Sequence, residues 1–202
     1  MRLILGSSSK IRQRLLREIC PDFIVRSADI DEYSIKLDHE EDRARSDPSS
    51  LVLAIARAKL HRICDDLDVT NQEATVVITM DSVVYHNGEI REKPKSPEQC
   101  RQWMRQYQLQ SVSACTGVVI KNMATGCQVE GVAHAVQYYR PIPDQELEHI
   151  IDQGEILGCA GGYIVSIPEI QPYLGDRVGD LDTLMGFPSL LLRQLLQQVQ
   201  DI

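Results

Sequence analysis

The sequence predicts an α/β fold in which helices cover a twisted, mixed β-sheet. Short apolar segments typical of strands alternate along the chain with longer segments whose apolar residues recur at helical spacing. Because strands and helices are interspersed, a helix-covered sheet accounts for the pattern better than a helical bundle or a β-sandwich does. A chain of 202 residues is long enough to bury a sizeable core. We therefore expect residues 1–202 to form one domain, either as a single body or as two lobes around a central cleft.

The N-terminal segment combines a short strand, a serine-rich turn and a helix. Residues 2–5 are mostly apolar, and a turn of one glycine and three serines follows them at residues 6–9. A helix begins directly after this turn, because Ile11, Leu15 and Ile19 then fall on one face.

A second strand and a longer helix come next. Residues 22–26 are predicted to form the strand. The helix covers residues 51–64, and Asp47, Ser49 or Ser50 can serve as its N-cap.

From residue 75 onward the apolar pattern indicates mainly strands. Residues 75–80 are apolar, and residues 82–86 continue extended as far as Asn87-Gly88, a dipeptide that favours a type I′ hairpin turn. The elements expected after this hairpin are a helix at 96–107, strands at 111–121 and 128–140, a helix at 143–153, a glycine-containing strand at 159–166 and a helix at 189–200.

Composition and charge exclude several classes of function. With 21 basic and 29 acidic residues the net charge is -8, whereas non-specific nucleic-acid binding depends on a broad positive surface. The six cysteines show no C-x-x-C pair, which argues against a zinc site or a disulfide framework and suits a reducing compartment. No apolar run approaches the length of a membrane span, and the N-terminus lacks a signal-peptide pattern. We therefore expect a cytoplasmic protein without a nucleic-acid or membrane partner.

The serine-rich turn is a candidate anion site. Backbone N–H groups and the hydroxyls of Ser7 and Ser9 can hold a phosphate at a helix N-terminus, where the helix dipole is positive. The turn lacks the second glycine of a P-loop, and Ser9 could simply cap the helix. Lys10, Arg12 and Arg14 lie near the positive end of the dipole, at a cost of ~0.3–1 kcal/mol each that a bound phosphate would offset. The turn thus predicts either a helix cap or a phosphate site.

Lys59 and Asp81 are charged residues within apolar segments. Lys59 falls in the apolar stripe of its helix, so its ammonium group either extends to solvent or meets an anion at a cleft. Asp81 lies between apolar strand residues, and a buried carboxylate needs cations, hydrogen-bond donors or a metal as partners. A β-bulge that turns Asp81 to solvent is the alternative. Lys93 ends the far strand of the hairpin and could return towards Asp81, although a lysine before a turn proline is usually exposed.

Glu32, together with Asp31, adds a second carboxylate after the second strand, in addition to that of Asp81. Two carboxylates brought together can bind Mg²⁺, which prefers oxygen ligands and commonly bridges to substrate phosphates. An exposed acidic loop is the alternative for this segment.

The order and spacing of these motifs resemble the Maf (septum-formation) family over nearly the whole chain. Residues 3–12 are similar to the family's L-I-L-A-S-x-S-P-x-R signature, and residues 56–59 resemble its A-x-x-K helix. Residues 81–84 and 88–94 resemble its D-x-x-V…G-x-x-x-x-K-P hairpin, and residues 184–188 resemble its closing L-V-G-L-P segment. Each motif is weak alone, but their combined order is specific.

The resemblance implies a nucleoside-triphosphate pyrophosphatase, which cleaves between the α and β phosphates to give the monophosphate and pyrophosphate. It also implies an elongated α/β fold similar to inosine-triphosphate pyrophosphatases, a divalent metal cofactor (Mg²⁺ or Mn²⁺) and a homodimer. Asp81 would act as general base or metal-linked activator of water, and Glu32 would help to hold the metal. By position, the residues that would hold the phosphates are Ser7, Ser9, Arg12, Lys59 and Lys93.

The base preference is left open by Ile11, Ser82 and Ser166, the positions at which the branches of the family differ. Residues 159–163 resemble the branch that acts on 7-methyl-GTP. That branch has tryptophan, glutamine and glutamate at or near the three positions, whereas the pyrimidine-acting branch has arginine, threonine and glutamine. This chain matches neither set, so we expect a modified or non-canonical nucleotide of undecided base. A non-catalytic nucleotide-binding regulator on the same fold is the alternative function.

Overall fold

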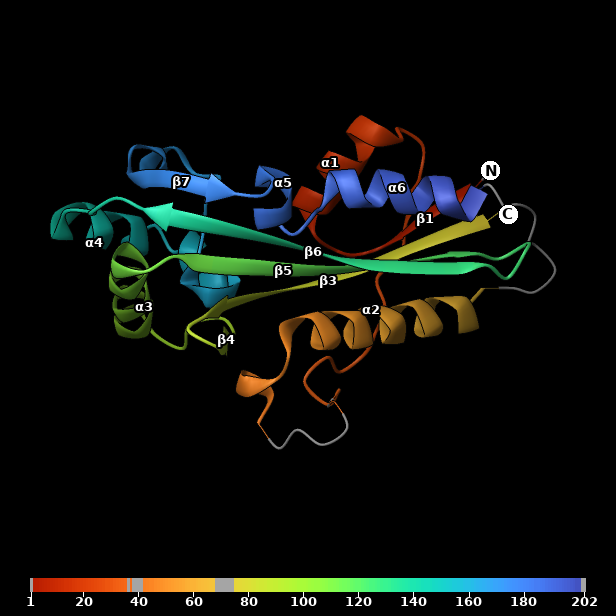
Figure 1. Ribbon diagram of the computed structural model, residues 1–202, viewed down its shortest axis with the longest axis horizontal. Coiled ribbons are helices and arrows are strands. Elements are labelled where there is room, and N and C mark those ends of the chain that lie inside the picture. The colour runs from red at the N-terminus through yellow and green to blue at the C-terminus, as the bar shows by residue number, and fades with distance from the viewer. Residues whose placement is uncertain (1, 36, 38–41, 68–74, 201–202) are drawn as a thin grey trace.

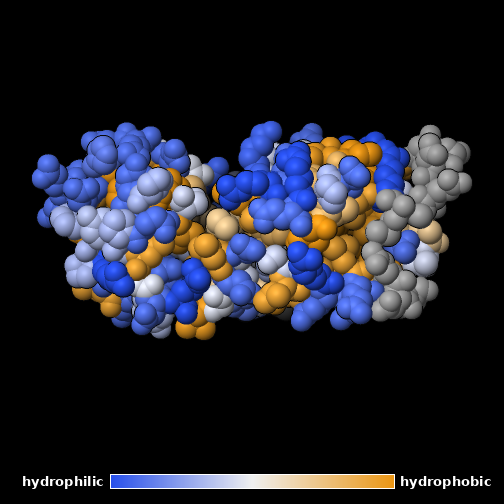
Figure 2. Space-filling view, turned by 90° about the horizontal axis from the view of Figure 1, so that it is seen from above, coloured by the Kyte–Doolittle hydropathy of each residue, from blue (hydrophilic) through white to orange (hydrophobic). Residues whose placement is uncertain are grey.

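The architecture is a seven-stranded mixed sheet with helices on both faces, which confirms the predicted α/β class. The structure is a computed structural model that describes residues 2–35, 37, 42–67 and 75–200. Three long strands, β3 (Thr75–His86), β5 (Val112–Asn122) and β6 (Gln128–Tyr139), run along the length of an elongated molecule (Figure 1). Seen from above, the surface narrows between two wider ends (Figure 2).

The sheet has the strand order β2-β1-β3-β5-β6-β7, and β4 (Glu89–Arg91) pairs with the end of β3. β1 (Arg2–Gly6) is parallel to both β2 (Ile24–Val25) and β3, whereas the other pairs, including β7 (Leu174–Val178), are antiparallel. The parallel pairing places the end of β1, and the serine turn after it, beside the middle of β3.

The helices cover the sheet in the positions that Figure 1 shows. α1 and α6 lie on one face, α2 lies on the other, and α3 and α4 pack at the end of the sheet away from the N-terminus. Their bounds are α1 (Lys10–Ile19), α2 (Pro48–Asp65), α3 (Pro97–Leu109), α4 (Asp144–Asp152), α5 (Leu181–Leu184) and α6 (Ser189–Gln200). Within the described residues, none of the helices has the length and apolar character needed to cross a membrane.

Local signals in the sequence account for several element boundaries. The side chain of Asp47 accepts a hydrogen bond from the Ser50 N–H at 2.8 Å and so caps α2. Asn87 and Gly88 have φ values of 51° and 77°, the left-handed backbone that the predicted hairpin turn between β3 and β4 requires. These predictions are confirmed.

The predicted strand at 159–166 is wrong. Two short 3₁₀ turns, η3 (Glu155–Gly158) and η4 (Ala160–Gly162), lead into an irregular segment there. Gly161 and Gly162 have φ values of 68° and 53°, which interrupt an extended backbone. A Cβ at Gly161 would lie 2.5 Å from Val84 Cγ1, so the backbone approaches β3 more closely than another residue type would permit. The sequence pattern also missed β7, α5 and η5 (Pro168–Tyr173).

Candidate active site

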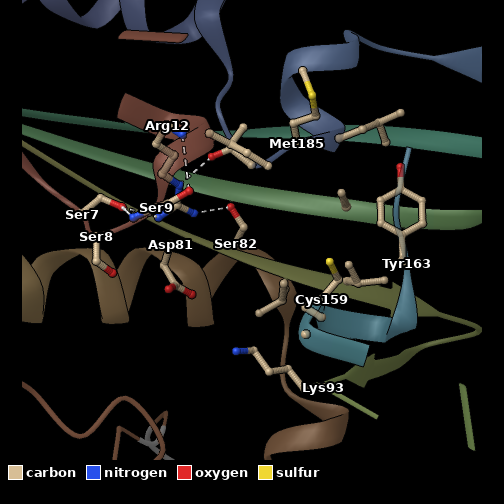
Figure 3. Close-up of a pocket in the computed structure, with 18 of the residues that line it drawn as sticks. Ser7, Ser8, Ser9, Arg12, Asp81, Ser82, Lys93, Cys159, Tyr163 and Met185 are labelled. Atoms are coloured by element: carbon tan, nitrogen blue, oxygen red, sulfur yellow. Dashed lines mark hydrogen bonds between the residues drawn. The ribbon is translucent and has the colours of Figure 1, made fainter. Parts of the chain in front are cut away.

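A cavity of about 570 Å³ lies where the end of β1, the middle of β3 and the segment before α6 come together (Figure 3). Every residue to which the family resemblance gives a role lines it, whereas Lys10, Arg14 and Asp31 do not. The residues with a role are Ser7, Ser9, Ile11, Arg12, Glu32, Lys59, Asp81, Ser82, Lys93 and Ser166. The structure therefore brings together side chains from segments that are far apart in the sequence.

The serine turn between β1 and α1 forms one wall of the cavity. Ser9 is the N-cap of α1, and its hydroxyl accepts a hydrogen bond from the Arg12 N–H at 3.4 Å. Ser7 is buried, and its hydroxyl accepts one from the Ser9 N–H at 3.3 Å. Both interpretations of the turn are thus compatible, because Ser9 caps the helix while the turn faces the cavity. A helix N-terminus facing a cavity is suited to hold an anion.

Asp81, Lys59 and Glu32 form a cluster of charges at the same end of the cavity. The Lys59 ammonium lies 2.7 Å from Asp81 Oδ1 and 2.8 Å from Glu32 Oε1. Asp81 stays in register with Gly117 of β5, so it belongs to a continuous strand and not to a bulge. Lys59 is 8% exposed and Asp81 is 6% exposed, which excludes the alternative in which the lysine extends to solvent. We call this cluster, with the serine turn, the polar end of the cavity.

The electrostatic environment of Asp81 is set by two opposing effects. Burial raises the pKa of the Asp81 carboxyl group, whereas the ammonium of Lys59 and then the guanidinium of Arg12 lower it. Burial dominates, so the pKa lies above the ordinary range of an aspartate. A carboxylate with a raised pKa in a cavity is a candidate proton acceptor.

Arg12 makes four hydrogen bonds to protein acceptors around the polar end. Its guanidinium donates to the Gly186 carbonyl at 2.9 Å, to the Met80 carbonyl at 2.8 Å and to the Ser82 hydroxyl at 2.8 Å. A longer bond of 3.5 Å reaches the Ser7 hydroxyl. Most of its N–H donors are therefore directed at the protein, which leaves little capacity for the predicted phosphate contact.

The opposite end of the cavity is mostly apolar. Lys93 is exposed at its edge, and Figure 3 shows its ammonium group turned towards the side of Asp81. The apolar end consists of Val84, Ala114, Cys159, Ala160, Tyr163, Ile164, Val165, Leu184 and Met185. Ser166 lies on this side, whereas Ile11 and Ser82 lie near the serine turn and Arg12.

The two carboxylates fit a divalent cation. Oxygens of Asp81 and Glu32 approach one ammonium nitrogen within 2.8 Å, so both can reach a single positive ion. In the described part of the chain, no group of three or more histidine, cysteine, aspartate or glutamate side chains could hold a metal alone. Mg²⁺ often binds through one or two carboxylates together with water and substrate phosphates, which matches this donor set. Lys59 would have to move for such an ion to enter.

Residues of the apolar end were largely missed by reasoning from the sequence. Leu184 and Met185 belong to a motif without an assigned role. Tyr163 belongs to a predicted strand and to the segment that resembles the 7-methyl-GTP branch, again without a role of its own. The adjacent pair Gly161-Gly162 was the available signal, because consecutive glycines commonly mark a backbone that leaves regular structure.

The chain belongs to the Maf family, since the family model described as "Maf-like protein" matches residues 2–199 of its sequence. The resemblance drawn from the motifs is thereby confirmed. It extends over almost all of the chain and includes both ends of the cavity.

Three curated relatives show how activities are named within this group. A 7-methyl-GTP pyrophosphatase of Dictyostelium discoideum is 35% identical, with 98% of each chain covered. A nucleoside triphosphate pyrophosphatase of Nocardia farcinica is 30% identical, covering 98% of this chain and 92% of the relative. A dTTP/UTP pyrophosphatase of Alkaliphilus metalliredigens is 28% identical, covering 98% and 95%. These names agree with the predicted class of activity, and they differ in the base.

Proposed function

We propose that the protein hydrolyses a nucleoside triphosphate between its α and β phosphates and releases the monophosphate and pyrophosphate. The observation that carries this proposal is the buried Asp81–Lys59 pair, which faces the same cavity as the N-terminus of α1. A carboxylate with a raised pKa can accept a proton from water, and the helix N-terminus can hold a phosphate. The pyrophosphatase names of the relatives support the same reaction.

The residues of the polar end, together with Lys93, can carry out the reaction as a displacement by water. The serine turn and Lys93 hold the triphosphate from two sides of the cavity, while Asp81 orients a water molecule towards the α phosphorus. The water oxygen bonds to this phosphorus as Asp81 accepts its proton. The bond from the α phosphorus to the bridging oxygen then breaks, and pyrophosphate leaves with the electron pair. Positioning and charge stabilisation are the main requirements of phosphoryl chemistry.

Asp81 and Glu32 would hold the divalent cation, Mg²⁺ or Mn²⁺. When bound, such an ion neutralises the charge that develops on the phosphate oxygens. Lys59 would then have to leave the two carboxylates that it pairs with, and its ammonium could pair with a phosphate at the same end of the cavity.

We also propose that the base occupies the apolar end and that the substrate is a modified or non-canonical nucleotide. The apolar end supplies aliphatic side chains and one aromatic ring, Tyr163, for contact with a planar base. The relatives named for 7-methyl-GTP support a modified base.

The test is pyrophosphate release by the purified protein with Mg²⁺ or Mn²⁺ across 7-methyl-GTP, UTP, dTTP, CTP, ITP and the common purine triphosphates. We expect metal-dependent, equimolar monophosphate and pyrophosphate from one or a few of them. Binding of nucleotide without any hydrolysis across the panel would instead support the non-catalytic regulator.

A further inference from the structure

The hydroxyl group of Ser82 is held between two side chains of the protein. It accepts a hydrogen bond from Arg12 Nη2 at 2.8 Å and lies 2.8 Å from the Thr116 hydroxyl. Ser82 and Thr116 are opposite each other in the β3–β5 ladder, so both side chains lie on the same face of the sheet. Thr116 is completely buried. A hydroxyl has one proton and two lone pairs, and these two contacts use most of that capacity.

Arg12 contacts the chain on both sides of Asp81. Its guanidinium donates to the carbonyl of Met80, the residue before Asp81, and to the hydroxyl of Ser82, the residue after it. A third bond, at 2.9 Å, goes to the carbonyl of Gly186 in the segment between α5 and α6. We call this set of bonds the Arg12 network. It connects the first turn of α1 with the strand that carries Asp81 and with the segment before α6.

The directions of the side chains separate Ser82 from the proposed reaction space. Successive residues of a strand point to opposite faces, and Figure 3 shows Asp81 and Ser82 doing so. Asp81 points to the α2 side, where it meets Lys59, whereas Ser82 points to Arg12. The space around Ser82 is also crowded, because a Cβ built on Gly186 would lie only 2.9 Å from its hydroxyl oxygen.

We propose that Ser82 and Thr116 are positioning residues, which act through Arg12 to fix the backbone at Asp81, and that Ser82 does not select the base. This inference rests on the proposed function. Ser82 stands at one of the positions at which the branches of the family differ. In this chain its hydroxyl holds Arg12 and does not contact the base.

The two roles of Ser82 predict different kinetic patterns. A base-selecting residue changes the ratio of kcat/KM between nucleotides when it is replaced. A positioning residue lowers kcat for all nucleotides by a similar factor, because the water-orienting carboxylate is less well placed whichever base is bound.

The experiment compares Ser82→Ala, Thr116→Val and Thr116→Ser with the unmodified protein on the two or three best nucleotides of the panel. Ser113→Ala is the matched control, since Ser113 lies on β5 near Thr116 and does not line the cavity. We expect Ser82→Ala and Thr116→Val to lower kcat about tenfold, the effect of losing one hydrogen bond to a charged network. KM and the ratios of kcat/KM between nucleotides should stay within about twofold of those of the unmodified protein. Thr116→Ser keeps the hydroxyl, so it should retain most of the kcat that Thr116→Val loses.

Hydrogen–deuterium exchange tests the same inference without turnover. We expect Ser82→Ala to speed exchange both at residues 79–83 and at residues 184–188, two segments that the Arg12 network connects. A changed ratio between nucleotides in Ser82→Ala would overturn the inference, as would an unchanged kcat in both Ser82→Ala and Thr116→Val. If the unmodified protein releases no pyrophosphate, the proposed function fails, and exchange alone then decides whether the network exists in solution.

Discussion

The two ends of the cavity are built in different ways. The Asp81–Lys59 pair of the polar end is carried by regular elements, because Lys59 projects from α2 and Asp81 from β3, and the two are joined by a hydrogen bond of 2.7 Å. The apolar end is formed largely by irregular segments around η4, where Gly161 has a positive φ of 68°. The Asp81–Lys59 pair is therefore fixed by helix and strand geometry. The surface suited to a base is instead fixed by tertiary contacts of loops.

The largest effect is expected for Asp81→Asn at the polar end. An amide cannot accept the proton of the attacking water, so kcat should fall by roughly 10²–10⁴. Steady-state pyrophosphate release is the measurement, and the thermal unfolding temperature is the control for folding. Activity close to that of the unmodified protein would remove Asp81 from the mechanism.

Lys59 should oppose metal binding in the nucleotide-free protein, because its ammonium occupies the position between the Asp81 and Glu32 carboxylates. We expect Lys59→Gln to tighten Mn²⁺ binding at least about tenfold, since one positive charge beside the ion is removed. Titration followed by the electron paramagnetic resonance of free Mn²⁺ measures this directly. Lys93→Gln is the comparison, because Lys93 lies at the far edge of the cavity, and a similar gain in that variant would show a general charge effect.

The same Lys59→Gln variant should shift the pH dependence of turnover. The ammonium of Lys59 lowers the pKa of Asp81, against the larger effect of burial, which raises it. Without the ammonium the pKa rises further, so ionised Asp81 is reached only at higher pH. The acid limb of the profile of kcat/KM against pH should therefore move to higher pH. A limb that stays in place or moves to lower pH contradicts the assignment of that limb to Asp81.

The smallest effect is expected at the apolar end, from Tyr107→Phe. The Tyr107 hydroxyl donates to the Gly161 carbonyl at 2.7 Å and so holds the wall of the cavity from behind. Its loss should cost about 0.5–1.5 kcal/mol of stability and should change the ratios of kcat/KM between nucleotides a few-fold. The kcat for the best nucleotide should change little, because the polar end is untouched. Tyr138→Phe, at a residue that is 46% exposed, is the control, and equal effects in both variants would remove the special role of Tyr107.

The polar end was predictable because its residues lie in short motifs whose order resembles the Maf family, although each motif alone leaves an alternative open. The serine turn sits between an apolar strand and a helix, and Lys59 interrupts an apolar stripe that would otherwise be continuous. Asp81 lies among apolar strand residues, so its burial could be expected, and a buried carboxylate needs a partner. The pairing of Lys59 with Asp81 depends on the packing of α2 against β3, and the position of the serine turn depends on the parallel register of β1 with β3. No local sequence pattern contains either contact.

The apolar end was less predictable because its geometry comes from long-range contacts. The apolar residues of 159–166 indicate a strand when they are read alone. In the structure the Tyr107 hydroxyl donates a hydrogen bond to the Gly161 carbonyl, and the Gly161 N–H donates one to the Glu92 carbonyl. The Tyr139 hydroxyl donates to the carbonyl of Ile164. These partners come from α3, the end of the β3–β4 hairpin and β6, so they are known only once the chain is folded. The hydrogen bonds from Arg12 to the carbonyls of Met80 and Gly186 could not be predicted from the sequence either, because they also join segments that are far apart along the chain.

In the proposed reaction, water directed by Asp81 attacks the α phosphorus. The most direct test is hydrolysis of the preferred triphosphate in ¹⁸O-labelled water, with mass spectrometry of both products. Attack at the α phosphorus predicts one ¹⁸O atom in the nucleoside monophosphate and none in the pyrophosphate. Label in the pyrophosphate, or release of diphosphate and inorganic phosphate, would contradict the account.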